Sequence, residues 1–191
     1  MAFDILAMIL RAAAGFFTIL FLVRVAMRLL RISFITPLGQ FVLTTTNWAV
    51  LPLQKVLPAI GRLELAALMP AWLVQVALVL LLVLISGRSP GMPMSLALGA
   101  ALIGAFQLVY LSLYLVMGVV IISVILSWVN PHAPMAGPIN ALARPLLAPF
   151  RRILPPISGL DISPLIFLLV LQILLYVLQR ASDSFLFLLY I

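Results

Sequence analysis

The sequence predicts an all-α membrane protein with four transmembrane helices, arranged as two parallel tandem repeats of helix, amphipathic interfacial connection and helix. Three observations lead to this prediction. Of the 191 residues, 66% are hydrophobic and only 8% are charged, too few polar groups to cover a protein surface in water. The apolar residues gather in runs of about 20, the length that a helix needs to cross a bilayer. One segment of the chain also occurs twice without a gap.

Four apolar runs are long enough to cross a bilayer, and we expect spans at residues 5–30, 68–86, 105–128 and 163–178. The third run is the hardest to delimit. From Ser95 to Val129 it has no charged residue, and at about 1.5 Å per residue it exceeds a hydrocarbon core of about 30 Å. We therefore expect the residues from Ser95 to Gly104 to tilt, kink or lie at the interface. The N-terminal residues lack the basic segment of a secretory signal, so the first span is expected to be retained.

The connection that follows the first span is repeated after the third. "PLQKVLPAIGRLELAAL", from Pro52, aligns without a gap with "PFRRILPPISGLDISPL", from Pro149, so that Glu64 matches Asp161 (161 − 64 = 97). Self-similarity at a fixed separation indicates a tandem duplication. Because each copy crosses the membrane twice, both copies begin on the same side and the repeats are parallel. We expect the first repeat to comprise residues 1–90 and the second residues 91–191.

The net charge of +7 is not gathered in one patch of the kind that binds nucleic acid. Most cations follow the first and third spans, whereas Arg88 and Arg180 fall on the opposite side and Arg11 lies within the first span. The positive-inside rule then predicts cytoplasmic connections and termini on the outer side. The cations assigned to the cytoplasmic side are Arg28, Arg31, Lys55, Arg62, Arg144, Arg151 and Arg152. No direct nucleic-acid partner is expected.

The second connection has the spacing of an interfacial helix. Its polar face holds Asn140, Arg144 and Arg151, and its apolar face holds Ile139, Leu142, Leu146, Phe150 and Ile153. Pro145 and Pro149 are expected to break it into two short pieces that lie along the membrane surface. Arg151 and Arg152, like Lys55 in the first copy, would then either anchor the segment to anionic lipid headgroups or dock a membrane or cytoplasmic protein partner.

The residues "PPISGLDISP" turn the chain from the surface into the fourth span. Pro155, Pro156 and Gly159 are residue types that favour a turn. Either Asp161 or Ser163 can accept hydrogen bonds from the free N–H groups of the first helical turn. The motif therefore predicts a sharp entry into a capped helix.

Three roles remain open for Asp161 and for Glu64, its counterpart in the first repeat. Each acid could begin a helix, where the negative charge suits the helix dipole. The acids could instead form ion pairs that join the repeats, Asp161 with Arg28 or Arg31 and Glu64 with Arg144. A third role is a proton or ion path. The arginines available in the first span, Arg24, Arg28 and Arg31, share one face at i, i+4 and i+7.

Little in the sequence indicates catalysis or a bound cofactor. The chain has no cysteine, which excludes disulfides, thiolate metal sites and covalent thioether haem. His132, the single histidine, lies in a proline-rich loop, and four acids give few groups for general acid–base chemistry. We therefore expect no enzyme, cofactor or metal site. A stripe of small residues, Ala97, Ala101 and Gly104, predicts close helix packing within the chain or between copies of it.

The second repeat resembles the YggT family, also called YlmG, of bacteria and plastids. The resemblance rests on "ILSWVNP" and on "ARPLLAPFRRILPPISGLDISPLIFLLVLQILL", and it extends to the first repeat because the family commonly carries two copies. In the family pattern an arginine lies a few residues before the Ser-Trp pair. This chain has Ser123 near that place, whereas the first copy keeps Arg24 and Arg28 in the equivalent helix.

The resemblance implies a small integral protein of the bacterial inner membrane without established enzymatic activity. Family members are often encoded near cell-division genes and are associated with osmotic or ionic stress, and plastid members with cytochrome b6 haem maturation or nucleoid distribution. We therefore expect a non-enzymatic scaffold or assembly factor. The alternative is a small conduit for ions or osmolytes, suggested by Arg11, Gln75, Gln107 and Gln172 within apolar stretches. A conduit of four spans would need self-association.

Overall fold

A computed structural model describes residues 2–57, 61, 63–87, 93–130, 132–153 and 161–189. In these residues the chain forms six helices, which are α1 (Ala2–Leu29), α2 (Pro37–Gln54), α3 (Leu65–Ile85), α4 (Pro93–Val129), α5 (Ala136–Ile153) and α6 (Ser163–Leu189). Four of them, α1, α3, α4 and α6, are long and apolar enough to cross a membrane. The predicted all-α fold with four spans is therefore confirmed, and the chain is a multi-pass membrane protein.

The third apolar run forms one unbroken helix that is longer than the span expected at residues 105–128. Helix α4 is continuous from Pro93, and its apolar part begins at Leu96. Contacts with α3 hold the N-terminal part of α4, because the indole N–H of Trp72 donates to the carbonyl of Ala101 at 3.1 Å. The residues expected to kink or lie at the interface are thus part of the bundle. Helix α6 starts at Ser163 as expected but runs past residue 178, with an apolar stretch to Ser182.

The seam between the two repeats includes the contact of α3 with α4, and this contact depends on a small residue. A Cβ atom at Gly104 would lie 2.7 Å from Cγ2 of Val76 and 3.2 Å from its backbone nitrogen. Only glycine lets the two helices approach this closely. The small-residue stripe was expected to pack either within the chain or between copies of it, and Gly104 packs within the chain.

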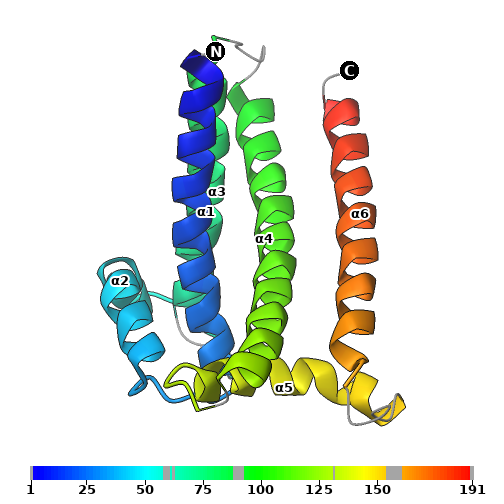
Figure 1. Cartoon of the computed structure of the whole chain (residues 1–191). Helices are drawn as coiled ribbons and strands as arrows, with labels where there is room; N and C mark the ends of the chain where they lie inside the picture. The colour runs from blue at the N-terminus through cyan, green and yellow to red at the C-terminus, as the bar shows by residue number, and fades with distance from the viewer. Residues whose placement is uncertain are drawn as a thin grey trace.

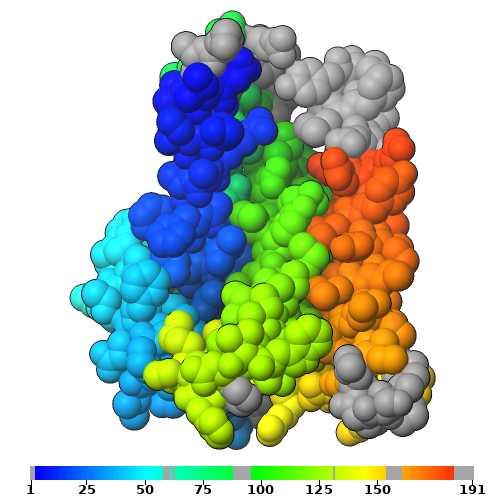
Figure 2. Space-filling model, viewed as in Figure 1, coloured from blue at the N-terminus to red at the C-terminus, as the bar shows by residue number. Residues whose placement is uncertain are grey.

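The helices form an upright bundle with two shorter helices at one end (Figure 1). Within each repeat the two spans pair, α1 with α3 and α4 with α6. Helix α2 lies beside the lower part of α1, and α5 crosses the base between α4 and α6 (Figure 1). The first turn of α1 and the last turn of α6 lie at the opposite end. In the space-filling view the side chains of α4 meet those of α1 on one side and of α6 on the other (Figure 2).

Helices α2 and α5 have matching inner faces, which supports the gapless alignment of the repeats. The buried positions Gly39, Val42, Thr46 and Val50 of α2 correspond to the buried positions Ala136, Ile139, Ala143 and Leu147 of α5 at the same separation of 97 residues. The inner face of each helix packs on the spans of its own repeat, and Val42 of α2 and Leu142 of α5 also meet in a cluster with Leu20 of α1 that joins the two repeats. Val50 joins a cluster with Phe21 and Ala67, and Leu147 joins one with Val120 and Phe167.

Helix α5 is one continuous helix, so the expected break into two pieces is wrong. Pro145 and Pro149 both lie on its exposed face. A proline within a helix leaves the carbonyl four residues earlier without its hydrogen bond. On an exposed face water or headgroups can satisfy that carbonyl, so the helix tolerates both prolines. The inner face, with Ile139 and Leu142 buried, supplies the packing that keeps it helical.

Candidate functional site

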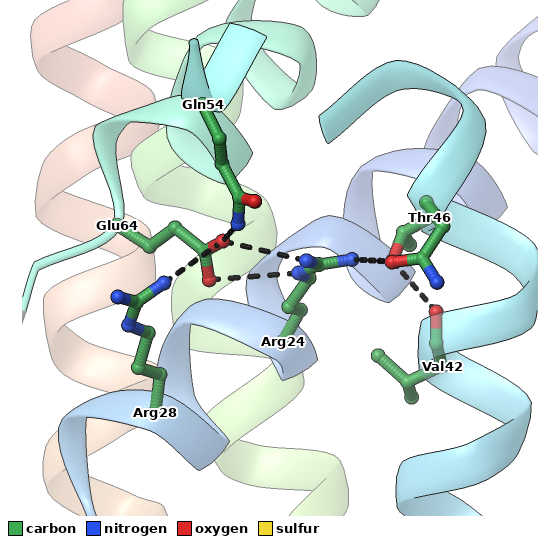
Figure 3. Close-up of polar contacts among 7 residues, drawn as sticks. Arg24, Arg28, Val42, Thr46, Gln54 and Glu64 are labelled. Carbon is green, nitrogen blue, oxygen red and sulfur yellow. Dashed lines mark hydrogen bonds and ion pairs between the residues drawn. The ribbon is translucent and has the colours of Figure 1, made fainter. Parts of the chain in front are cut away.

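Two groups of polar residues occupy equivalent places at the base of the bundle, one in each repeat. The repeat-one cluster consists of Arg24, Arg28, Thr46, Asn47, Gln54 and Glu64 (Figure 3). The repeat-two cavity is lined by α4, α5 and the start of α6, and its polar lining includes Ser123, Ser127, Asn140, Arg144, Arg151 and Asp161. The contacts that fill the repeat-one cluster help to explain why the equivalent place in repeat two is a cavity.

Glu64 is the centre of the repeat-one cluster. Its side chain is 2% exposed, and its carboxylate lies 3.4 Å from Nη2 of Arg24 and 3.1 Å from Nη1 of Arg28. The side-chain amide of Gln54 donates to the same carboxylate (Figure 3). Two cations and one amide thus surround a buried anion that comes just before α3.

Arg24 uses its remaining donors on α2. Its Nη1 donates to the hydroxyl of Thr46 at 2.9 Å and to the amide oxygen of Asn47 at 2.7 Å. The Thr46 hydroxyl in turn donates to the carbonyl of Val42 at 2.6 Å (Figure 3). Arg24 therefore connects α1 to both α2 and the start of α3, and it does so although it lies inside a candidate span. A buried arginine within a span is expected to face the protein interior and to be paired, as it is here.

The predicted ion pairs between repeats are wrong. Glu64 pairs with Arg24 and Arg28 of its own repeat, and Asp161 pairs with Arg151 of its own repeat. Glu64 does stand at the N-cap position of α3, as the helix-start role predicts, but its side chain makes no capping bond there. Its carboxylate turns to the arginines because the buried guanidinium of Arg24 needs a counter-charge. Arg31 lies beyond the end of α1, with a positive φ of 56°, and so leaves the helix face shared by Arg24 and Arg28.

Asp161 fulfils its predicted role at the start of a helix and also forms an ion pair within its own repeat. One carboxylate oxygen accepts from the backbone N–H of Ser163 at 3.0 Å, at the start of α6, and the other accepts from Nε of Arg151 at 2.8 Å. Partial burial raises the pKa of Asp161, but the hydrogen bonds from Ser163 and from the Arg151 guanidinium outweigh it, and the pKa lies below its ordinary value. The carboxylate is therefore ionised at neutral pH, with both oxygens occupied.

Ser163 is completely buried, and its hydroxyl lacks a hydrogen-bond partner among the residues that the structure describes. The bond to Asp161 is thus made by the Ser163 backbone, with the hydroxyl close by but not in hydrogen-bonding geometry. The matching position in the first repeat is Ala66, which needs no partner. The predicted capping partner of the fourth span is Asp161 and not Ser163.

The repeat-two cavity has a volume of about 410 Å³. Its wall is held by a hydrogen bond of 2.6 Å from the hydroxyl of Ser123 to the amide oxygen of Asn140, which links α4 to α5. Trp128, at the end of the α4 span, lines it and is 73% exposed. Arg144 also lines it, and in the described part of the chain this guanidinium has no ion-pair or hydrogen-bond partner.

The cavity exists because small residues in the second repeat stand where long ones fill the first. Ser123 and Ser127 are four residues apart on the helix before α5, as Arg24 and Arg28 are on the helix before α2. The separation between the two pairs is 99 residues (123 − 24 = 99), two more than the 97 that relates α2 to α5. Cations occur instead on α5. Arg144 corresponds to Asn47, and Arg151 to Gln54, at the separation of 97 residues. The arginines have thus moved from the span to the amphipathic helix, leaving the space beside the span empty of side chains.

Several of the residues singled out in the sequence lie away from this geometry. Lys55 and Arg152 are exposed at the ends of α2 and α5, and neither is part of the cluster or the cavity lining. Pro155, Pro156 and Gly159 lie outside the described residues. Sequence reasoning missed Thr46, Asn47, Gln54 and Ser127. Aligning the repeats position by position could have found them, because the exchange of Asn47 and Gln54 for arginines is visible there.

A second, smaller cavity of about 350 Å³ lies near the other end of the bundle, lined by Arg11, Gln107 and Gln179, among others. Of the other glutamines expected to mark a conduit, Gln75 is buried and donates to Thr18 at 2.8 Å, and Gln172 is exposed. Between the two cavities, α4, α5 and α6 pack an apolar cluster that includes Val120, Leu147, Phe167 and Leu171. The polar groups therefore form separate sites and no continuous row.

Comparison with known proteins identifies the family. The family model described as CCB3/YggT matches residues 3–85 and 102–182, one segment in each repeat. An uncharacterised protein of Pseudomonas aeruginosa is 34% identical over 168 residues, covering 87% of this chain and 84% of the relative. A protein of Escherichia coli K12 named YggT, also described as uncharacterised, is 31% identical over 170 residues, covering 88% and 86%. No solved structure matches. The resemblance seen in the second repeat is thus confirmed over both repeats, and the chain belongs to the CCB3/YggT family.

Proposed function

We propose that this protein is a non-enzymatic scaffold or assembly factor of the bacterial inner membrane, with α2 and α5 on the cytoplasmic side and both termini outside. The observation that carries the proposal is where the polar chemistry lies. The cluster and the larger cavity are both at the base of the bundle, together with the exposed Lys55 and Arg152. A protein that presents a surface for assembly concentrates its distinctive side chains on that surface.

Further support comes from what the charged residues already do. Glu64 and Asp161 have both carboxylate oxygens engaged by protein donors, which leaves neither as a free general base. The positions of the cations also agree with the positive-inside rule that was applied to the sequence. Arg144, Arg151 and Arg152 are on α5, at the end that the positive-inside rule assigns to the cytoplasm.

Ile153 and Val56 are the proposed contact points for a partner. They are equivalent positions in the two repeats, they close α5 and follow α2, and they are 77% and 76% exposed. Two apolar side chains presented in the same way by two parallel repeats suit a partner that binds both. A role in cell division or in the response of the envelope to osmotic stress belongs to this proposal.

Photo-crosslinking in growing cells tests the scaffold. A crosslinking residue is placed at Ile153, at Val56 and, as a control, at Leu84, which is 80% exposed in the last turn of α3 at the other end of the bundle. We expect one protein captured at both base positions and not at Leu84, and we expect deletion of that protein and deletion of this one to impair growth at high osmolarity in the same way. Adducts confined to lipid or to other copies of this chain would contradict the proposal.

The alternative function, a conduit for ions or osmolytes, is favoured by the cavity at Arg11. The apolar cluster between the two cavities argues against it, because an ion crossing Val120 and Phe167 would lose its hydration without new ligands. Flux through the purified protein in liposomes decides between the two functions. We expect flux equal to that of protein-free vesicles for potassium, sodium and protons, and a reproducible excess for any of them would favour the conduit.

A further inference from the structure

We propose that the repeat-two cavity binds one phosphate group, carried either by an anionic phospholipid headgroup or by free phosphate. This site is independent of the scaffold role and of any protein partner. It rests on a contrast between the donors and the acceptors among the six polar side chains that line the cavity.

The acceptors of the cavity are occupied. Asp161 is its one acid, and its two oxygens accept from Ser163 and from Arg151. The amide oxygen of Asn140 accepts from the hydroxyl of Ser123. A ligand that enters the cavity therefore meets few free lone pairs, which disfavours a cation.

The donors of the cavity are free within the described part of the chain. Arg151 uses only its Nε on Asp161, so its two terminal nitrogens remain available. The guanidinium of Arg144 has no partner there, and the amide nitrogen of Asn140 and the hydroxyl of Ser127 make no hydrogen bond within the described lining. Two guanidinium groups against one carboxylate leave one net positive charge. A planar guanidinium with free terminal nitrogens suits the bidentate recognition of phosphate.

The repeat-one cluster shows that this arrangement is not a general consequence of the fold. There every terminal nitrogen of Arg24 has an acceptor within the protein, on Glu64, Thr46 or Asn47. The same positions in the second repeat combine shortened side chains on α4 with added cations on α5. The shorter side chains on α4 leave the cavity open, and the arginines on α5 place hydrogen-bond donors at its wall. Together these two differences make an anion site.

The size and the place of the cavity fit the ligand. A volume of about 410 Å³ lies within the range of about 300–1,000 Å³ typical of small-ligand sites. The lining residues Ser127 and Trp128 are at the last turns of the α4 span, and Pro164 opens the α6 span. The ends of spans lie where phospholipid headgroups are found, and a tryptophan at that level is typical of the interface.

Binding to the purified full-length chain in a neutral detergent tests the proposal. The probes are dioctanoyl phosphatidylglycerol and inorganic phosphate, each titrated separately and followed by isothermal calorimetry. We expect one site per chain. Arg144→Gln should weaken binding at least about tenfold, since a hydrogen bond to a charged group is lost. Because Arg144 has no partner in the described residues, this variant is expected to fold normally.

Arg152→Gln is the matched control. Arg152 follows Arg151 on the same helix and carries the same charge, but it does not line the cavity. We expect its affinity for phosphate ligands to stay within about twofold of the wild type, because the lost charge is screened. Ser127→Leu is a second variant, which keeps every cation and fills the cavity, and it should also weaken binding at least about tenfold.

The outcomes separate the two sources of phosphate. Binding of phosphatidylglycerol that depends on Arg144 and Ser127, and that phosphate displaces only weakly, identifies a headgroup site. Binding of phosphate alone with the same dependence identifies a free-phosphate site. Absence of binding by both probes, or losses equal in Arg152→Gln and Arg144→Gln, would overturn the proposal, because the interaction would then be bulk charge and not a site.

Discussion

At the base of the first repeat polar side chains satisfy one another, whereas at the base of the second repeat the corresponding positions surround a cavity. The difference depends on a few exchanges, two arginines for Ser123 and Ser127 on the span and two neutral residues for Arg144 and Arg151 on the amphipathic helix. A duplication lets one copy keep a structural network while the other is released from it. The first repeat, on this view, holds the bundle together and the second interacts with what surrounds the protein.

The largest expected loss of stability comes from a change in the repeat-one cluster. Glu64→Gln removes the counter-charge of Arg24, which is 4% exposed, and should lower the free energy of unfolding by about 3–5 kcal/mol. The matched change Asp161→Asn should cost less than about 1 kcal/mol, because that pair is more than one third exposed and screened by solvent. Thermal unfolding in detergent, followed by near-UV circular dichroism, measures both. Equal losses would mean that the repeats do not differ as described.

The seam that joins the repeats should respond next. Gly104→Ala places a methyl group against Val76 and should destabilise the protein by about 1–3 kcal/mol. Gly118 is the control on the same helix, since a Cβ there meets nothing within 4 Å, and Gly118→Ala should be neutral or stabilising by about 0.5–1 kcal/mol. Chemical denaturation of both variants decides, and a Gly104→Ala protein as stable as Gly118→Ala would show that the seam is looser than described.

A smaller difference in stability between the repeats is expected at the hydrogen bond between Gln75 and Thr18. Thr18→Val leaves the amide of Gln75 without its buried partner and should cost about 1–2 kcal/mol. Gln172, the counterpart of Gln75, is exposed, so Gln172→Leu should change stability by less than about 0.5 kcal/mol. The same unfolding assay applies. A larger loss for Gln172→Leu than for Thr18→Val would reverse the assignment of the buried polar contact to the first repeat.

The smallest effect concerns pH and belongs to the second repeat. Since the pKa of Asp161 is lowered in the folded protein, its ion pair stabilises the fold fully above the ordinary value of 3.8 and less as the pH falls through the folded pKa. Wild type and Asp161→Asn should therefore differ slightly at about pH 6 and converge as the pH falls below the folded pKa of Asp161. Melting temperatures measured across this range test the sign, and a difference that grows on acidification would contradict it.

The fold could largely be predicted from the sequence, because long apolar runs and a gapless repeat leave little freedom. The N-terminal extension of α4 could not, since no polar residue marks where a charge-free run becomes a span. The continuity of α5 also escaped prediction, because it depends on Pro145 and Pro149 lying on the exposed face. Which face a proline occupies is decided by the packing of the whole helix.

The candidate site was predicted in its residues more than in its contacts. Arg24, Arg28, Glu64, Arg151 and Asp161 were all identified from charge in an apolar chain, and all form ion pairs. Their partners were not, because Arg24 and Glu64 are separated by 40 residues and meet only through the placing of α2 and α3. The cavity was harder to predict than these contacts, because a shortened side chain can be recognised in the sequence only when the two repeats are compared.

The contrast between the repeats is tested most directly by measuring two variants in one assay. Glu64→Gln and Arg144→Gln are each heated in detergent with and without dioctanoyl phosphatidylglycerol, and the melting temperature is recorded. We predict that Glu64→Gln melts well below the wild type but is still stabilised by the lipid, and that Arg144→Gln melts like the wild type but is no longer stabilised. A lipid effect that survives in Arg144→Gln, or a normal melting temperature in Glu64→Gln, would contradict the division of roles between the two repeats.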